Sequence, residues 1–316
     1  MNKFIGLTKR NLLIFFKDKQ SVIFSLMTSI IVFVLYLLFL RGTFVDAIQS
    51  AMKEAPGLAD LVQDKDVKMY ANLTLLVGIL GSALITVPFN CLTVVVRDKE
   101  NKVDYDILST PIRRWQVILS YFTAAVISAV VMTGIILTVG LLLLGTQGDL
   151  YMGAKEIAQA YGIVALGSFS ATALFMIVVL FFKSSSACGA FFSMVSAAAG
   201  FVIGAYIPIS QFSDGVQTVC NIFPACQVTI LLRNALLSAL LQHMDTAIGG
   251  LDNGMFVESI KETFSFDASL FGQNYGMSSM IIYVAAFMVL CVAVMIFVYG
   301  KTYKKKYDLN NMYELW

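Results

Sequence analysis

Charged residues are scarce in this chain of 316 residues. Asp, Glu, Lys and Arg make up 13% of the sequence, about half of the ~25% that is usual in a soluble domain. Hydrophobic residues make up 58%, which is more apolar surface than a soluble fold of this length hides from water. A bilayer removes this difficulty because it replaces water as the solvent. The composition therefore predicts an integral membrane protein, and a net charge of only +2 gives no indication of a nucleic-acid partner.

The residues needed for catalysis and for ATP binding are also missing. There is no Gly-x-x-x-x-Gly-Lys-Ser/Thr loop to hold the phosphates of ATP. His243 is the only histidine, and no nucleophile partner for it is apparent in the sequence. No ionisable residue lies within the long apolar runs, which argues against a proton relay or an ion site. We predict that the chain is not an enzyme, that it has no catalytic residue and that it holds no cofactor.

Cysteines are few and widely spaced, without a Cys-x-x-Cys pair or a Cys/His cluster, so no metal site is predicted. Cys91, Cys188 and Cys291 lie in apolar runs and are expected to be buried. Cys220 and Cys226 lie in a stretch with polar flanks, where either two free thiols or a small outer disulfide fits the sequence.

Six uncharged runs are long enough to cross about 30 Å of hydrocarbon as helices, which need about 20 residues each. Helices are expected because the backbone must satisfy its own hydrogen bonds in lipid. The chain contains no convincing repeat, so we predict one all-α membrane domain over residues 1–316. The six runs are 22–40, 71–96, 117–144, 157–182, 187–209 and 279–300.

The distribution of Lys and Arg predicts the orientation of the chain in the membrane. If the N-terminus is cytoplasmic, the inner segments 1–21, 97–116, 183–186 and 301–316 hold 15 Lys and Arg residues, and the outer segments hold 7. This bias follows the positive-inside rule. We therefore expect a multi-pass protein of the plasma membrane with both termini in the cytoplasm, which requires an even number of spans.

Two further stretches are apolar but are not predicted to span. Residues 228–241 are interrupted by Arg233 and Asn234, and we interpret them as a re-entrant or interfacial element of the outer loop. In the N-terminal stretch, Lys3, Arg10 and Lys17 are seven residues apart and share one face of a helix. This pattern is typical of an amphipathic helix in the inner headgroup layer, although a plain basic flank of the first span fits it too.

Two features within the spans suggest packing or a pathway. Small residues recur in the fifth span, and such spacing lets helices approach closely, either in a dimer or within one chain. These residues are Gly189, Ser193, Ser196, Gly200 and Gly204. In the second span, Pro88 removes a backbone hydrogen bond, so we expect a kink at Pro88 and Asn90. Both a kink that lines a pathway and one that does not fit the sequence.

The segment 97–116 is the most informative part of the sequence. Five basic and four acidic residues alternate in it, and it also carries apolar residues that we expect to be exposed: Ile107, Leu108 and Ile112. Exposed apolar groups on a charged loop indicate a surface for a partner. Ser109 and Thr110 before Pro111 predict that one helix ends and another starts here.

This segment resembles the inner loop of ABC type-2 exporter permeases. The resemblance lies in Arg97-Asp98-Lys99-Glu100, followed by Leu108-Ser109-Thr110-Pro111 and then by Arg113-Arg114-Trp115. A Gly-Thr pair that is usual in the family is replaced here by Lys102-Val103. The resemblance implies a cytoplasmic coupling helix that docks on an ATP-binding subunit. The residues that would contact that subunit are Glu100, Asp104, Leu108, Thr110, Pro111, Ile112, Arg113 and Arg114.

A second match lies in the outer segment, where Pro208, Pro224 and Arg233 follow the family's pattern of two prolines and an arginine. The resemblance implies six transmembrane helices, the amphipathic helix, the coupling helix and the re-entrant element before the last helix. It also implies two copies of an ATP-binding subunit, which hold ATP and Mg²⁺, and a second permease that is either identical or similar.

The resemblance also implies the direction and the class of cargo. A path without fixed charges suits a hydrophobic or amphiphilic molecule that leaves the cell, such as a drug, a lipid-like molecule or an antimicrobial peptide. A lipid-linked glycan is the alternative cargo. A passive channel or a membrane scaffold is the alternative class of protein.

Overall fold

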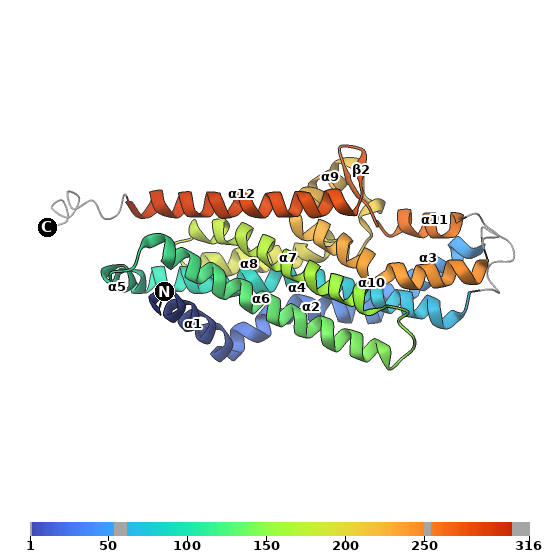
Figure 1. Ribbon diagram of the computed structural model, residues 1–316, viewed down its shortest axis with the longest axis horizontal. Helices are drawn as coiled ribbons and strands as arrows, with labels where there is room; N and C mark the ends of the chain where they lie inside the picture. Colours follow the sequence, from blue (N-terminus) through green and yellow to red (C-terminus); the bar gives the residue numbers. More distant parts are fainter. Residues whose placement is uncertain (1, 54–61, 250–253, 305–316) are drawn as a thin grey trace.

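The computed structural model describes residues 2–53, 62–249 and 254–304, and its described part is almost entirely helical (Figure 1). The first part contains α1 (Asn2–Lys17), α2 (Lys19–Leu35), a π-helical turn η1 (Tyr36–Leu40) and α3 (Arg41–Lys53). The central part contains α4 (Asp64–Glu100), α5 (Val103–Ser109), α6 (Arg114–Gly145), α7 (Ala154–Leu180) and α8 (Ser185–Val202).

The last part begins with the 3-10 turn η2 (Ile209–Gln211), α9 (Asp214–Ile222), α10 (Pro224–Ile248) and α11 (Met255–Thr263). A short antiparallel hairpin follows, formed by β1 (Ala268–Leu270) and β2 (Gln273–Tyr275), in which Ser269 pairs with Asn274. The chain then enters α12 (Met277–Lys304).

Helix α4 is the centre of the bundle. It is 37 residues long, and at 1.5 Å per residue it rises about 55 Å, so it extends well beyond one bilayer thickness. Nearly all of its apolar side chains are buried, because α2, α6, α7, α8 and α10 surround it. The predicted kink residue Pro88 lies within α4, which continues through it.

The two ends of the bundle differ. Helix α5, helix α1 and the last described turn of α12 lie at one end, called the α5 end below (Figure 1). Helices α3 and α11 lie at the other end, called the α11 end (Figure 1). The six predicted runs all correspond to helices, since their residues fall in α2–η1, α4, α6, α7, α8 and α12, apart from the last residues of the fourth and fifth runs.

Seven helices in the described ranges, not six, are long and apolar enough to cross a membrane. The additional one is α10, which has 25 residues, whereas the sequence suggested an apolar stretch of only 228–241. Arg233 and Asn234 do not interrupt this helix because protein, not lipid, surrounds them. Arg233 donates a hydrogen bond to the carbonyl of Ser265 (2.6 Å), and Asn234 donates one to the carbonyl of Phe266 (2.7 Å).

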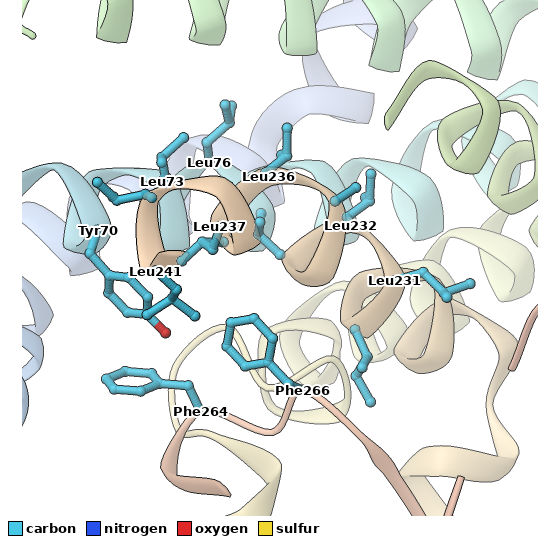
Figure 2. Close-up of a cluster of buried hydrophobic side chains, with 14 of the residues drawn as sticks. Tyr70, Leu73, Leu76, Leu231, Leu232, Leu236, Leu237, Leu241, Phe264 and Phe266 are labelled. Atoms are coloured by element: carbon cyan, nitrogen blue, oxygen red, sulfur yellow. The ribbon is translucent and has the colours of Figure 1, made fainter. Parts of the chain in front are cut away.

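Leucines on α10 fill the core at the α11 end. Leu236, Leu237 and Leu241 pack against Tyr70 and Leu73 of α4, with the rings of Phe264 and Phe266 below them (Figure 2). At the other end of α10, Gly81 of α4 and Gly167 of α7 leave room for Thr229 and Val228, because a Cβ atom at either glycine would overlap these side chains. Helix α10 therefore starts within the bundle and extends towards the α11 end (Figure 1).

Candidate functional site

The segment between α4 and α6 forms a short, well-defined helical element. The chain leaves α4 through Asn101 and reverses at Lys102, which has a left-handed backbone (φ 61°). Helix α5 ends at Ser109, and the Thr110 hydroxyl donates to the carbonyl of Ile107 (2.6 Å). Pro111 cannot continue a helix. Helix α6 then starts at Arg114, and the break predicted at Thr110–Pro111 is present.

One face of α5 is buried against the bundle. Asp104 and Ile107, three residues apart, are both only 8% exposed. The prediction that Ile107 is exposed is therefore wrong, because this residue packs into the apolar core at the α5 end. Ile112 and Arg114 are half-buried, and Arg113 and Pro111 are exposed. The side chain of Leu108 lies outside what the structure describes.

Two aromatic side chains are exposed around α5. Tyr105 on α5 is 39% exposed, and Trp115 in the first turn of α6 is 46% exposed. Asp106, Ser109 and Thr110 are exposed as well. The accessible surface of this element therefore combines hydroxyl and charged groups with two aromatic residues of the kind that is enriched at protein interfaces.

The run from Arg97 to Glu100, at the end of α4, contacts different helices with successive side chains. Asp98 is buried and accepts two hydrogen bonds from Arg10 of α1 (2.6 and 2.9 Å) and one from Tyr121 of α6 (2.5 Å). The hydrogen bond to Asp98 raises the pKa of Arg10 above its ordinary value. Arg97 lies 3.6 Å from Asp18, which caps the start of α2.

The other two residues of the run hold the turn between α7 and α8. The Lys99 ammonium donates to the carbonyls of Leu180 (3.0 Å) and Phe182 (3.1 Å), where α7 ends. The Glu100 carboxylate accepts from the backbone N–H of Ser185 (3.0 Å), where α8 begins. Hydrogen bonding to the Ser185 side chain, and secondly to its backbone N–H, lowers the pKa of Glu100 below its ordinary value. Glu100, predicted to contact a partner, is thus used within the chain.

The small residues of the fifth predicted span, which lie in α8 and in the turn after it, have separate environments. Gly200 is covered by the ring of Tyr206, and Gly204, with φ +70°, lies against Ile209, so a Cβ atom at either position would overlap a side chain. At Gly189 a Cβ atom would meet nothing within 4 Å. The Ser193 hydroxyl donates to the Gly189 carbonyl (3.0 Å), and the buried Ser196 hydroxyl has no hydrogen-bond partner in the described part of the chain.

An apolar groove of about 690 Å³ lies between α2 and α8. It shares Ser193 and Ser196 with the set of small residues on α8. No acidic or basic side chain is found among the described residues that line it, which are Phe24, Met27, Thr28, Ile31, Leu35, Phe39, Phe192, Ser193, Ser196, Ala197, Phe201, Tyr206 and Ile207.

Asn90, predicted at the kink, is buried, and its side chain donates to the Ser21 carbonyl (2.6 Å). This contact is one of a row of polar contacts between α2 and α4, called the polar seam. The Thr86 hydroxyl donates to the Ser25 carbonyl (2.7 Å), and the hydroxyls of Ser29 and Ser82 are 3.0 Å apart. Sequence reasoning missed this seam, although polar residues four apart in both segments signal it: Ser21, Ser25 and Ser29 in one, and Ser82, Thr86 and Asn90 in the other.

The three residues predicted in the outer segment each begin or anchor an element. Pro208 precedes η2, and Pro224 is the first residue of α10. Arg233 is 3% exposed and ties α10 to the Ser265 carbonyl. Cys220 and Cys226 are both free and buried, so the disulfide alternative is not present in the structure.

In a comparison with known proteins, most of the chain matches one family. Residues 46–299 match the sequence model of the family described as ABC-2 family transporter protein. The matched range runs from α3 to α12 and includes α5 and the run that precedes it. No curated protein matches the chain significantly.

Proposed function

The chain belongs to the ABC-2 family of transporter membrane proteins, and on that premise we propose that it exports a hydrophobic or amphiphilic molecule from the cell. As a member of this family, it is a multi-pass membrane permease without a catalytic domain. ATP is bound by a partner subunit with which the permease associates. The proposal concerns the cargo, the direction of transport, the assembly and the parts of the chain that perform each task.

The proposal of an apolar cargo rests on the groove between α2 and α8. Sites for apolar ligands are concave and lined by aromatic and aliphatic side chains with a few polar groups, and this groove has that composition. Its size suits a drug-sized or lipid-like molecule. The hydroxyl of the exposed Ser193 supplies a polar point that orients such a cargo.

A second permease copy, or a similar permease, would cover this face. Helix α8 and helix α2 are the parts of the bundle that leave large apolar side chains exposed on both sides of the groove, among them Ile31, Met194 and Phe201. Two grooves that face each other would form one apolar path along the molecular axis. Gly189, with open space around it, lies on this face and permits close approach.

Helix α5 is the proposed coupling helix, and the α5 end is the proposed cytoplasmic end. Tyr105 on α5 is exposed, as are Arg113 and Trp115 at the start of α6, and these residue types dominate binding at protein interfaces. Two permeases would present two such elements to two ATP-binding subunits. Thr110 and Pro111 would fix the angle between α5 and α6, and so the position of the docking surface.

We further propose that α9 and α10 form a re-entrant pair rather than a membrane crossing. Their connecting turn reaches into the bundle, where the Phe223 ring lies 6.2 Å from that of Phe175 and Tyr283 donates to the Ile222 carbonyl (2.8 Å). At the far end of α10, His243 stacks on Tyr151 and lies 3.7 Å from Asp66, both in polar segments outside the predicted spans.

Thiol labelling tests this topology. Single cysteines at Gly215 and Ala247, both exposed, should react with a membrane-impermeant maleimide in intact cells, whereas one at Ser185 should react only after the membrane is opened. The five native cysteines are buried and should give little background. Labelling of positions 215 and 247 from opposite sides would show that α10 crosses the membrane.

Stimulated ATP hydrolysis tests the cargo. In the purified complex with its ATP-binding subunit, a graded series of amphiphiles should raise hydrolysis, and Phe192→Ala should weaken this response several-fold by removing one wall of the groove. Leu290→Ala on α12, which is 61% exposed and outside the groove, is the matched control. An equal response in both variants would remove the groove from the function.

A further inference from the structure

We propose that Lys99 and Glu100 form a clamp through which movement of α5 is passed to α8, and that they are positioning residues for transport rather than docking residues. This inference rests on the proposed function, in which α5 meets the ATP-binding subunit and α8 lines the cargo groove. The observation behind it is that two adjacent side chains of opposite charge hold the two ends of one interhelical turn.

Each charge of the clamp matches the helix end that it touches. The last carbonyls of a helix lack partners and carry partial negative charge, whereas its first N–H groups carry partial positive charge. Lys99 meets the carbonyls at the end of α7, and Glu100 meets the first N–H of α8. Exchanging the two charges would put each of them against a helix end of its own sign.

The clamp lies directly beside the proposed docking element. Only Asn101 and Lys102 separate Glu100 from the start of α5, and this link is the tight turn at Lys102. A displacement of α5 therefore reaches Glu100 across two residues. Figure 1 shows α5 at the end of the bundle where α4 ends.

Helix α8 is well placed to respond. It packs on α4 and α2, while most of its surface is exposed, with Cys188, Ala199 and Gly200 as its buried residues. At its α5 end, the clamp and the Ser184 hydroxyl, which accepts from Ala187 N–H (3.3 Å), hold its first turn. The same helix contributes Phe192, Ser196 and Phe201 to the groove, so a shift of its first turn reshapes the cargo path.

The neighbouring contacts of the run serve other helices. Asp98 connects α4 to α1 and α6, and Arg97 approaches the cap of α2. Loss of Lys99 or Glu100 therefore leaves these connections in place. A role limited to static stability predicts that clamp variants lower the thermal stability and every activity together, whereas a transmission role predicts loss of coupling alone.

The experiment uses the complete complex reconstituted in lipid nanodiscs, and it compares basal with amphiphile-stimulated ATP hydrolysis. Lys99→Met should retain the ATP-binding subunit and its basal hydrolysis, while stimulation falls roughly tenfold, the factor expected for loss of a charge-assisted hydrogen bond. Glu100→Gln should lose stimulation similarly, and the double variant should be no worse than the stronger single one, because both residues hold one turn.

Lys183→Met is the matched control, since it removes the same charge from an exposed residue of the same turn. If amphiphiles stimulate ATP hydrolysis in the wild type and to the same extent in Lys99→Met and Glu100→Gln, the clamp proposal is wrong, while the proposed function stands. A wild-type complex without stimulation by any amphiphile would overturn the proposed function as well.

A bridging measurement covers variants that fold poorly. Cysteines at positions 100 and 185, joined by a short bifunctional thiol reagent, replace the Glu100–Ser185 contact covalently. Amphiphile-stimulated ATP hydrolysis should be low before the two cysteines are bridged and should return afterwards. The reason is that the link between α4 and α8, and not the charge, transmits the movement. No recovery after complete bridging would contradict the proposal.

Discussion

Leu108→Asp is expected to release the ATP-binding subunit from the permease and to abolish transport. Position 108 lies on α5, between the buried Ile107 and the exposed Ser109, in the element proposed to dock. A charge placed in a small desolvated contact removes an anchor, and such anchors typically contribute about 2 kcal/mol or more, which corresponds to about 30-fold in affinity. The measurement is co-purification of the subunit together with transport of an amphiphile.

The control for this variant is Gln20→Asp. It adds the same charge at the α5 end, at an exposed position in the first turn of α2, where an acidic residue favours the helix. Both proteins should reach the membrane in equal amounts. Normal transport by Leu108→Asp would exclude α5 from energy transfer.

Gly200→Leu and Gly189→Leu are expected to fail in different ways. At Gly200 a side chain would overlap the ring of Tyr206 within the same chain, and overpacking of this kind costs about 1–3 kcal/mol or more. We expect this variant to lower the thermal stability of the permease even without a partner copy. At Gly189 a side chain meets nothing within 4 Å, so the chain itself should tolerate it.

The pair separates the two interpretations of the small residues on α8. If this face meets a second permease, Gly189→Leu should reduce the dimeric fraction, as measured by crosslinking in the membrane, while the stability of the single chain is unchanged. If the small residues serve only packing within one chain, Gly189→Leu should behave like the wild type in both assays.

The bundle was predictable because lipid imposes a simple rule on sequence. An uncharged run of about 20 residues has few alternatives to a helix, and the six runs do lie in helices. The same rule fails for α10, where Arg233 and Asn234 donate hydrogen bonds to carbonyls 32 residues later in the chain. A hydropathy pattern contains no information about such partners, so it underestimated the length of this helix.

The site was predictable in its position but not in its contacts. The break at Thr110–Pro111 follows from the inability of proline to continue a helix, and this property can be read from the sequence alone. The roles of Asp98, Lys99 and Glu100 depend on residues more than 20 positions away, such as Tyr121 and Ser185. Glu100 was therefore assigned to a partner, although its carboxylate accepts a hydrogen bond from within the bundle. Ile107 was misplaced for the same reason, since nothing local shows that α5 folds back on the core.

The π-helical turn at Tyr36–Leu40 changes the face of the helix on which the residues after it lie. One additional residue in a helical turn rotates everything after it by about 100° relative to what came before. Upstream of the turn, Ile31 and Phe33 are exposed, whereas downstream Phe44 and Ile48 are buried, with Phe44 against Phe264. In a relative whose helix lacks the additional residue of the π-helical turn, the apolar residues after the turn would have to stand one position earlier in the sequence. Only then would the same faces of the helix be buried before and after the turn. Alignments of the family should therefore open a single-residue gap between positions 36 and 40, and hydrophobic periodicity measured across that point should show a break.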